Sequence, residues 1–179
     1  MIKIKRVAIF IDEANIRGSQ KELKIYFDYI KLKDFLVGKN ELYNCFMYSQ
    51  GNADALHIGE KSPFYQKLTL SGFTVKFKPK KPILNENGQQ KNKCNVDVEL
   101  TLDVITTSPN YDIACLLTGD GDFCKLVDYL RFHGKEVIGV STKNVCSLDF
   151  KNSVDKFIDL NDIKDSIKLN KPYIKQGLF

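Results

Sequence analysis

The sequence lacks the cysteine and histidine patterns that build disulfide frameworks and zinc sites. Its five cysteines are odd in number and scattered, with no Cys-x-x-Cys pair, and its only histidines are His57 and His133. Disulfide frameworks and zinc sites need paired or regularly spaced ligands. We therefore expect neither, and we interpret both histidines as surface or packing residues rather than catalysts.

Long apolar runs and targeting signals are also missing. No segment approaches the run of about twenty apolar residues that a membrane span requires. The basic residues at the N-terminus lead directly into a short strand-like run without a small-residue cleavage site, which disfavours a signal peptide. We expect a cytoplasmic protein with no membrane partner. No repeat, low-complexity tract or linker divides the 179 residues, so we predict one domain, 1–165, and a tail, 166–179.

Continuous apolar runs indicate strands that are covered on both faces of a sheet. Four such runs occupy residues 7–11, 45–48, 113–117 and 137–140, and residues 73–77 offer a fifth. Segments of helical period lie between them, one containing Leu23, Phe27 and Ile30 and another beginning at Phe123. The alternation of strand and helix predicts an α/β fold with a mainly parallel sheet and helices on both sides.

The segment 96–105 alternates apolar and polar residues like a half-buried strand, but we predict a helix. Asn95 serves as its N-cap, and Asp97 lies in its first turn, where an acid suits the helix dipole. At about 100° per residue, Glu99 and Asp103 share a polar stripe that does not include Asp97.

Lysines concentrate around an excursion at residues 78–95, whose Asn-Gly signal predicts a short hairpin. The only acid in this stretch is Glu86, and the lysines are Lys76, Lys78, Lys80, Lys81, Lys91 and Lys93. A solvated surface loop explains such a run in isolation, and a polyanionic partner is the alternative. Beyond Ser147 we expect small helices that close the domain.

Carboxylates follow two of the predicted strands. Asp12 ends the first strand with Asn15 just beyond it, and Asp120 and Asp122 follow a later strand. In an open parallel sheet, ligands bind outside the carboxyl ends of the strands, and Asp97 would enter from the same side. We therefore expect the four acids and the amide to meet at this edge.

Four neighbouring carboxylates repel one another and resist joint ionisation unless a cation neutralises them. Mg²⁺ prefers oxygen ligands and shares its shell with phosphate, which indicates metal-assisted phosphodiester hydrolysis. Each residue also has a structural explanation: Asp122 as N-cap of the helix that begins at Phe123, Asn15 as a cap of the helix that follows it, Asp12 as the end of a strand, and Asp97 as a first-turn acid. Gly119 and Gly121 are expected to turn the backbone tightly and to leave space for a phosphate.

Three motifs also resemble the signature blocks of the NYN domain, specifically its LabA-like bacterial branch, a relative of the PIN-domain nucleases. They are FIDEAN, KCNVDVELTLDVIT and LLTGDGDFCKLVDYLRFHGKEVIGVS, and the later SLDFKNSVDKFIDL resembles the closing segment of that branch. The resemblance covers nearly the whole chain. It implies a PIN-like three-layer α/β/α fold with Rossmann-like topology, an acidic site dependent on Mg²⁺ or Mn²⁺, and cleavage of RNA.

The resemblance also assigns residues. The first-strand aspartate and nearby asparagine of the family fall on Asp12 and Asn15, and the other acids of its site fall on Asp97, Asp120 and Asp122. The second helical aspartate of the family falls on Asp103, which we treat as structural or peripheral. Glu13 stands where the usual block has glycine, so it either adds an acid beside the site or points outward.

The first hypothesis is a metal-dependent ribonuclease whose four aspartates hold the ion or its waters while Asn15 orients a carboxylate or water. The substrate is single-stranded RNA or a structured loop, and the residues expected to contact it are Thr118, Lys76, Lys78 and Lys93. A homodimer is an open alternative to a monomer. The second hypothesis is a catalytically silent module of the same fold that binds RNA or another protein. An aspartyl phosphatase is disfavoured because Asp-x-Asp is absent after the first strand, and the acid and lysine pair of a receiver domain has no convincing place.

Overall fold

The computed structural model describes residues 3–51, 62–84, 90–93 and 95–170. A six-stranded sheet in strand order β3-β2-β1-β6-β7-β8 forms its centre, and every neighbouring pair of strands is parallel. Its strands are β1 (Arg6–Asp12), β2 (Glu41–Gly51), β3 (Phe73–Pro79), β6 (Ile113–Leu117), β7 (Glu136–Ser141) and β8 (Lys156–Asp159). The predicted runs of apolar residues all became strands of this sheet.

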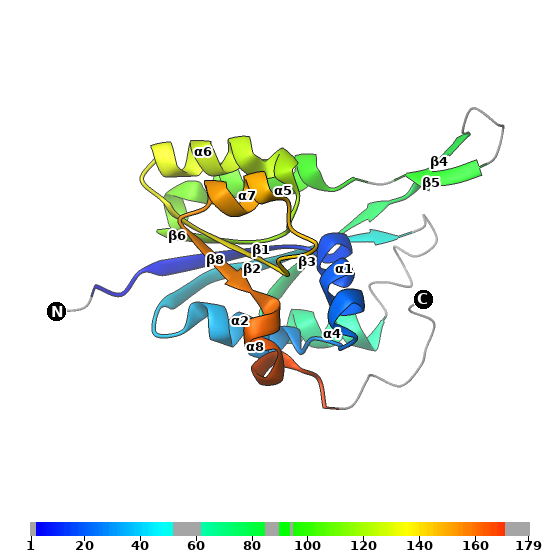
Figure 1. Cartoon of the computed structure of the whole chain (residues 1–179), viewed down its shortest axis with the longest axis horizontal. Coiled ribbons are helices and arrows are strands. Elements are labelled where there is room, and N and C mark those ends of the chain that lie inside the picture. Colours follow the sequence, from blue (N-terminus) through cyan, green and yellow to red (C-terminus); the bar gives the residue numbers. More distant parts are fainter. Residues whose placement is uncertain (1–2, 52–61, 85–89, 94, 171–179) are drawn as a thin grey trace.

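Seven α-helices in the described ranges cover the two faces of the sheet (Figure 1). One face carries α5 (Asp97–Thr107), α6 (Cys124–Phe132) and α7 (Leu148–Ser153). The other carries α1 (Glu13–Leu23), α2 (Tyr29–Val37), α4 (Pro63–Leu70) and α8 (Leu160–Ile167). The predicted three-layer α/β/α sandwich is therefore confirmed.

The central strand β1 shows why its sequence is continuously apolar. Val7, Ile9 and Ile11 face the layer of α1, α2, α4 and α8, whereas Ala8 and Phe10 face the layer of α5, α6 and α7. All five side chains are almost completely buried. A strand that is covered on both sides has no polar face, so the alternation typical of half-exposed strands is lost.

Several local predictions can be compared with the structure. The antiparallel strands β4 (Lys81–Leu84) and β5 (Gln90–Lys93) confirm the hairpin, although its Asn-Gly turn lies outside the described residues. Helix α5 is confirmed, but its N-cap is Val96. Asn95 lies one position earlier, and its Oδ1 accepts from the N–H of Asp97 at 2.7 Å.

The helix predicted around Leu23, Phe27 and Ile30 was wrong. Helix α1 ends at Leu23, Lys24 adopts a left-handed conformation with φ 55°, and α2 begins at Tyr29. Phe27 lies between the helices, where it pairs with Lys168 in an isolated antiparallel bridge. The short helices expected after Ser147 are α7 and α8, with strand β8 between them. None of the helices in the described ranges is long and apolar enough to cross a membrane.

Strand order places the candidate residues. The chain builds β1, β2 and β3 outward in one direction and then continues with β6 on the other side of β1. At such a switch point the connections after β1 and β6 leave in opposite directions, which opens a ligand site at the carboxyl ends of both strands. Asp12 and the loop after Leu117 therefore lie next to each other.

Candidate metal centre

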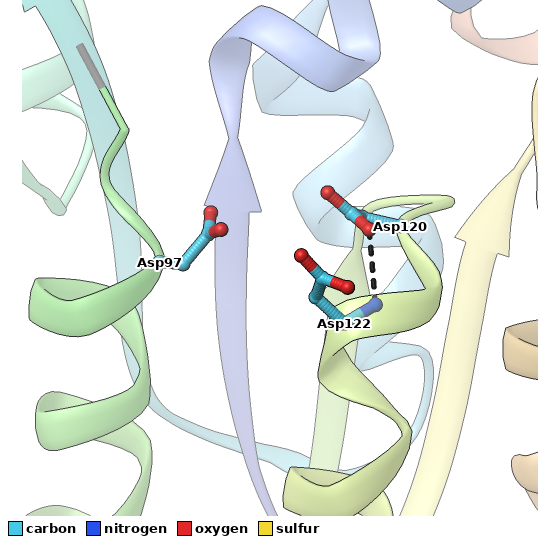
Figure 2. A group of neighbouring side chains, drawn as sticks. All are labelled: Asp97, Asp120 and Asp122. Atoms are coloured by element: carbon cyan, nitrogen blue, oxygen red, sulfur yellow. Dashed lines mark hydrogen bonds between the residues drawn. The ribbon is translucent and has the colours of Figure 1, made fainter.

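Three carboxylates meet at the switch point (Figure 2). Asp97 opens helix α5, whereas Asp120 and Asp122 lie in the loop between β6 and α6, which contains the 3₁₀ turn η2 (Gly121–Phe123). One oxygen atom from each of the three side chains lies within 4.8 Å of the others. The structure thus brings together residues that are separated by more than twenty positions in the chain.

Asp12 lies at the same edge of the sheet but is more deeply buried, with 7% of its surface exposed. It ends β1 and caps α1, because its Oδ1 accepts from the backbone N–H of Asn15 at 3.2 Å. Burial, together with the charges of Asp97 and Asp120, raises the pKa of Asp12 to about 6 against the lowering effect of the backbone hydrogen bonds. Asp12 does not belong to the three-oxygen group, but it interacts electrostatically with two of its members.

The pKa of Asp97 is also raised, first by burial and then by the charges of Asp120 and Asp122. A hydrogen bond from Asn95 and the positive charge of Lys78 act in the opposite direction. Mutual repulsion of this kind disappears when a cation binds between the carboxylates. The described donors are carboxylate oxygens without histidine or thiolate, and this set fits Mg²⁺ or Mn²⁺.

Hydrogen bonds hold the loop that carries Asp120 and Asp122. The Oδ1 atom of Asn15 accepts from the N–H of Gly119 at 2.8 Å, so α1 is tied to the loop after β6. Thr118 is 1% exposed, and its hydroxyl accepts from the N–H of Asp120 at 3.3 Å. Asp120 in turn accepts from the N–H of Asp122 at 3.0 Å. Asp120 is therefore the N-cap of this turn. The sequence had suggested Asp122 for this role, and that expectation was wrong.

The two glycines of the loop serve close packing. A Cβ atom at Gly119 would lie 2.7 Å from the Cα of Cys146, and one at Gly121 would lie 3.0 Å from the Oγ of Ser147. Neither glycine has a positive φ. The expectation that they leave space for a phosphate was wrong, because the segment that follows β7 occupies the space beside them.

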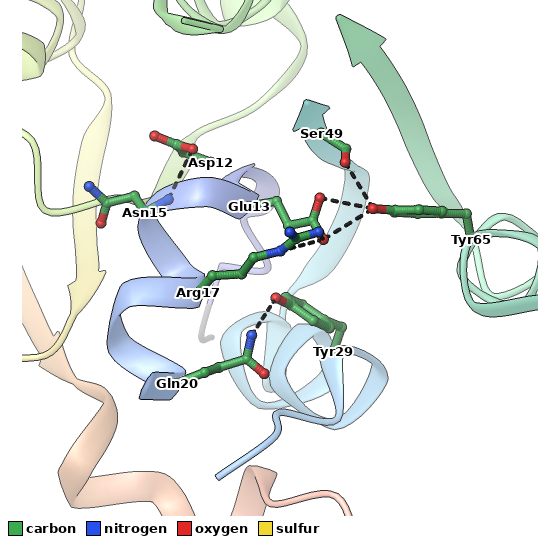
Figure 3. A network of polar contacts seen from close by, with 8 residues as sticks. All are labelled: Asp12, Glu13, Asn15, Arg17, Gln20, Tyr29, Ser49 and Tyr65. Carbon is green, nitrogen blue, oxygen red and sulfur yellow. Dashed lines mark hydrogen bonds and ion pairs between the residues drawn. The ribbon is translucent and has the colours of Figure 1, made fainter. Parts of the chain in front are cut away.

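Glu13 points away from the neighbouring side chain of Asp12 and toward Tyr65 (Figure 3). It is 4% exposed, and its carboxylate accepts from Arg17 Nη2 at 2.7 Å and from the hydroxyl of Tyr65 at 3.0 Å. The hydroxyls of Tyr65 and Ser49 lie 2.8 Å apart. Glu13 therefore neither joins the site nor points outward, which contradicts both expectations. Arg17, four residues later on the same helix, was the signal in the sequence for this ion pair.

The lysines of strand β3 are paired with acids of helix α5. The Nζ of Lys76 lies 2.6 Å from Asp103, which also accepts from the hydroxyl of Tyr48 at 2.7 Å. The Nζ of Lys78 lies 2.8 Å from Glu99. Asp103 thus lies outside the acidic group, in the structural position expected for it. These pairs border a groove of about 440 Å³ lined by Tyr48, Lys76, Phe77, Lys78, Val96, Glu99, Leu102 and Asp103.

The structure describes the other predicted residues to different extents. The side chain of Lys93 and all of His57 lie outside what the structure describes. His133 follows α6 on the surface, where its ring lies against that of Tyr129, with centroids 4.1 Å apart. This agrees with its interpretation as a surface or packing residue.

Comparisons with known proteins agree with the motifs. The family model of the NYN domain matches residues 6–161. "Low amplitude and bright protein LabA" from Synechococcus elongatus is 30% identical over an alignment of 172 residues that covers 91% of this chain and 88% of that protein. A crystal structure of a protein of unknown function from Vibrio parahaemolyticus superimposes with a TM-score of 0.74 at 26% identity. The match covers 94% of this chain and 99% of the other.

Proposed function

Because the chain belongs to the NYN domain family, we propose that it is a metal-dependent ribonuclease that hydrolyses phosphodiester bonds of RNA. NYN domains are PIN-like, and this superfamily consists generally of nucleases. The observation that carries the proposal is the convergence of Asp97, Asp120 and Asp122 within 4.8 Å at the switch point of the sheet. A structural role for each acid alone does not explain why they meet.

Asp97, Asp120 and Asp122, together with the buried Asp12, would hold Mg²⁺ or Mn²⁺ directly or through its waters. When bound, the ion lowers the pKa of a water molecule and neutralises charge on the scissile phosphate. The carboxylate of Asp12 is ionised only above about pH 6 and then adds to the negative charge of the site. Asn15 acts by fixing the peptide of Gly119, which positions the loop with two of the acids.

The proposed path of the RNA runs from the acidic group toward β3 and the hairpin. The hairpin β4–β5 projects from the carboxyl edge of the sheet and leads directly into α5 (Figure 1). Lys76 and Lys78 lie along this side in ion pairs with Asp103 and Glu99. Their contact with RNA phosphates, and that of Lys93, stays a prediction, and phosphate contacts of this type make binding sensitive to salt. The hydroxyl of Thr118 already accepts a backbone hydrogen bond, so its contact with phosphate stays a prediction. A homodimer also stays a prediction.

The proposal is tested by incubating labelled single-stranded and structured RNA with the purified protein in Mg²⁺, Mn²⁺ or EDTA. We expect cleavage with a divalent ion and none with EDTA. Asp120→Asn should abolish cleavage while keeping RNA binding, because it removes a charge from the site but keeps an oxygen that can accept from Asp122. Asp128→Asn is the matched control, since Asp128 lies on the surface of α6 and pairs with Lys125.

Two results would contradict the ribonuclease. One is a wild-type protein that is inert with every metal, and the other is equal cleavage by wild type and Asp120→Asn. RNA binding without cleavage, lost on charge reversal of Lys76 and Lys78 but unaffected by Asp120→Asn, would instead identify a non-catalytic RNA-binding module.

A further inference from the structure

Lys78 is bound to the segment that carries Asp97. Its Nζ donates to the backbone carbonyl of Asn95 at 2.6 Å and to the carboxylate of Glu99 at 2.8 Å. Asn95 Oδ1 accepts from the N–H of Asp97 at 2.7 Å. Lys78 therefore contacts the chain on both sides of Asp97, two residues before it and two residues after it.

We propose that Lys78 is a positioning residue that holds Asp97 in place for metal binding. The inference rests on the proposed function, because it assumes that Asp97, Asp120 and Asp122 bind the ion. The N-cap of α5, Val96, makes no side-chain hydrogen bond, so the helix start needs support from elsewhere. Repulsion from Asp120 and Asp122 acts to push Asp97 away, and the tether from Lys78 opposes this displacement.

Strand β3 gives the tether a fixed origin. Lys78 is paired in register with Gln50 of β2, so its backbone belongs to the sheet that also carries Asp12 and the loop after β6. Because the side chain of Lys78 connects this sheet to the start of α5, it restrains Asp97 relative to the sheet. Partners of metal ligands that act in this indirect way affect metal affinity by about 10-fold to 100-fold.

Lys76 is a matched control for Lys78. It lies two residues earlier on the same face of β3, and it pairs with Asp103, one helical turn after Glu99. Each lysine thus adds one positive charge and pairs with an acid of α5. The described polar contact of Lys76 is with Asp103, six residues beyond Asp97, whereas Lys78 contacts the residues that flank Asp97.

A purely electrostatic effect and a positioning role predict opposite changes in the Mn²⁺ affinity of Lys78→Met. Removing a lysine near the carboxylates removes a charge that repels the incoming cation, so on charge alone Lys78→Met and Lys76→Met should both bind Mn²⁺ somewhat more tightly. Loss of a tether instead weakens binding in Lys78→Met alone. The comparison of the two variants therefore separates positioning from charge.

The test is calorimetric titration of Mn²⁺ into the full chain without RNA, for wild type, Lys78→Met and Lys76→Met. We expect the Kd of Lys78→Met to rise about tenfold, at the lower end of the range for indirect partners. The Kd of Lys76→Met should stay equal or fall. In the metal-free proteins, hydrogen exchange at the amides of Asp97 and Leu100 should accelerate in Lys78→Met only.

Equal or tighter Mn²⁺ binding by Lys78→Met, with unchanged exchange at these amides, would overturn the inference while leaving the ribonuclease proposal intact. Absence of Mn²⁺ binding in the wild type would instead contradict the proposed function, and it would therefore also contradict the proposed role of Lys78. Urea unfolding of each variant distinguishes a local change at α5 from general loss of structure. Exchange that accelerates throughout the sheet in Lys78→Met would also count against a local tether.

Discussion

Replacing Asp12 with Asn should stabilise the metal-free protein, because the folded structure disfavours the ionised form of this side chain. The pKa of Asp12 is raised from 3.8 to about 6, mainly by burial. This pKa shift corresponds to a loss of about 3 kcal/mol of folding stability when the carboxylate is ionised in both the folded and the unfolded chain. Asn is isosteric and can still accept from the N–H of Asn15, so the cap of α1 is preserved.

The pH dependence of this effect has a definite sign. A raised pKa gives the folded protein a contribution to stability that is complete below pH 3.8 and is lost as the pH rises through about 6. Asp12→Asn carries no such titration at this site. We therefore expect the free energy of unfolding of the variant to exceed that of the wild type by only about 0.5 kcal/mol at pH 4 and by up to about 3 kcal/mol at pH 8.

Urea unfolding at pH 4 and pH 8 measures the difference, with and without Mn²⁺. The sequence contains no tryptophan, so far-ultraviolet circular dichroism is the suitable signal. Saturating Mn²⁺, at about 100 times Kd, should stabilise the wild type by about 2.7 kcal/mol and the variant by less. A variant that is less stable than the wild type at pH 8, or a difference that does not change with pH, would refute the reasoning.

Two further substitutions test other parts of the site. Glu13→Gln should lower the free energy of unfolding by about 1.5–3 kcal/mol, because it removes the charge that pairs with Arg17, yet leave Mn²⁺ affinity unchanged as measured by calorimetry. A clear loss of Mn²⁺ affinity would mean that Glu13 belongs to the metal site. Gly119→Ala should cost about 1–3 kcal/mol in urea unfolding, since its Cβ would lie 2.7 Å from the Cα of Cys146, and full stability would show that this segment can move aside.

The sequence predicted the parts of the fold that depend on burial on both sides of the sheet. Strands such as β1 and β6 are continuously apolar because helices cover both faces, and this pattern is visible without any structure. Strand β8 escaped prediction because it is short and lies at the edge of the sheet, where its side chains are only partly buried. The end of helix α1 at Leu23 was not predicted, because the residue in the left-handed conformation is Lys24 and not a glycine or proline that would mark a helix end.

Within the site, convergence of the acids could be predicted from strand order, but their local partners could not. Asp12 and Asp120 follow strands whose ends meet at a switch point, and this placement needs only the topology. The contacts of Lys78 with Asn95 and of Tyr65 with Glu13 depend on how helices dock on the sheet. The tight packing of Gly119 against Cys146 depends on a segment more than twenty residues later in the chain.

Both backbone polar groups of Gly119 are engaged from opposite sides of the sheet. Its N–H donates to Asn15 of α1, and its carbonyl accepts from the N–H of Ser147 at the start of α7, each at 2.8 Å. These two hydrogen bonds restrain the loop that carries Asp120 and Asp122. Ca²⁺ takes about six to eight ligands at longer distances, whereas Mg²⁺ accepts a compact site completed by water. Under the proposed function, we therefore expect a site held in this way to bind Mg²⁺ or Mn²⁺ in preference to Ca²⁺.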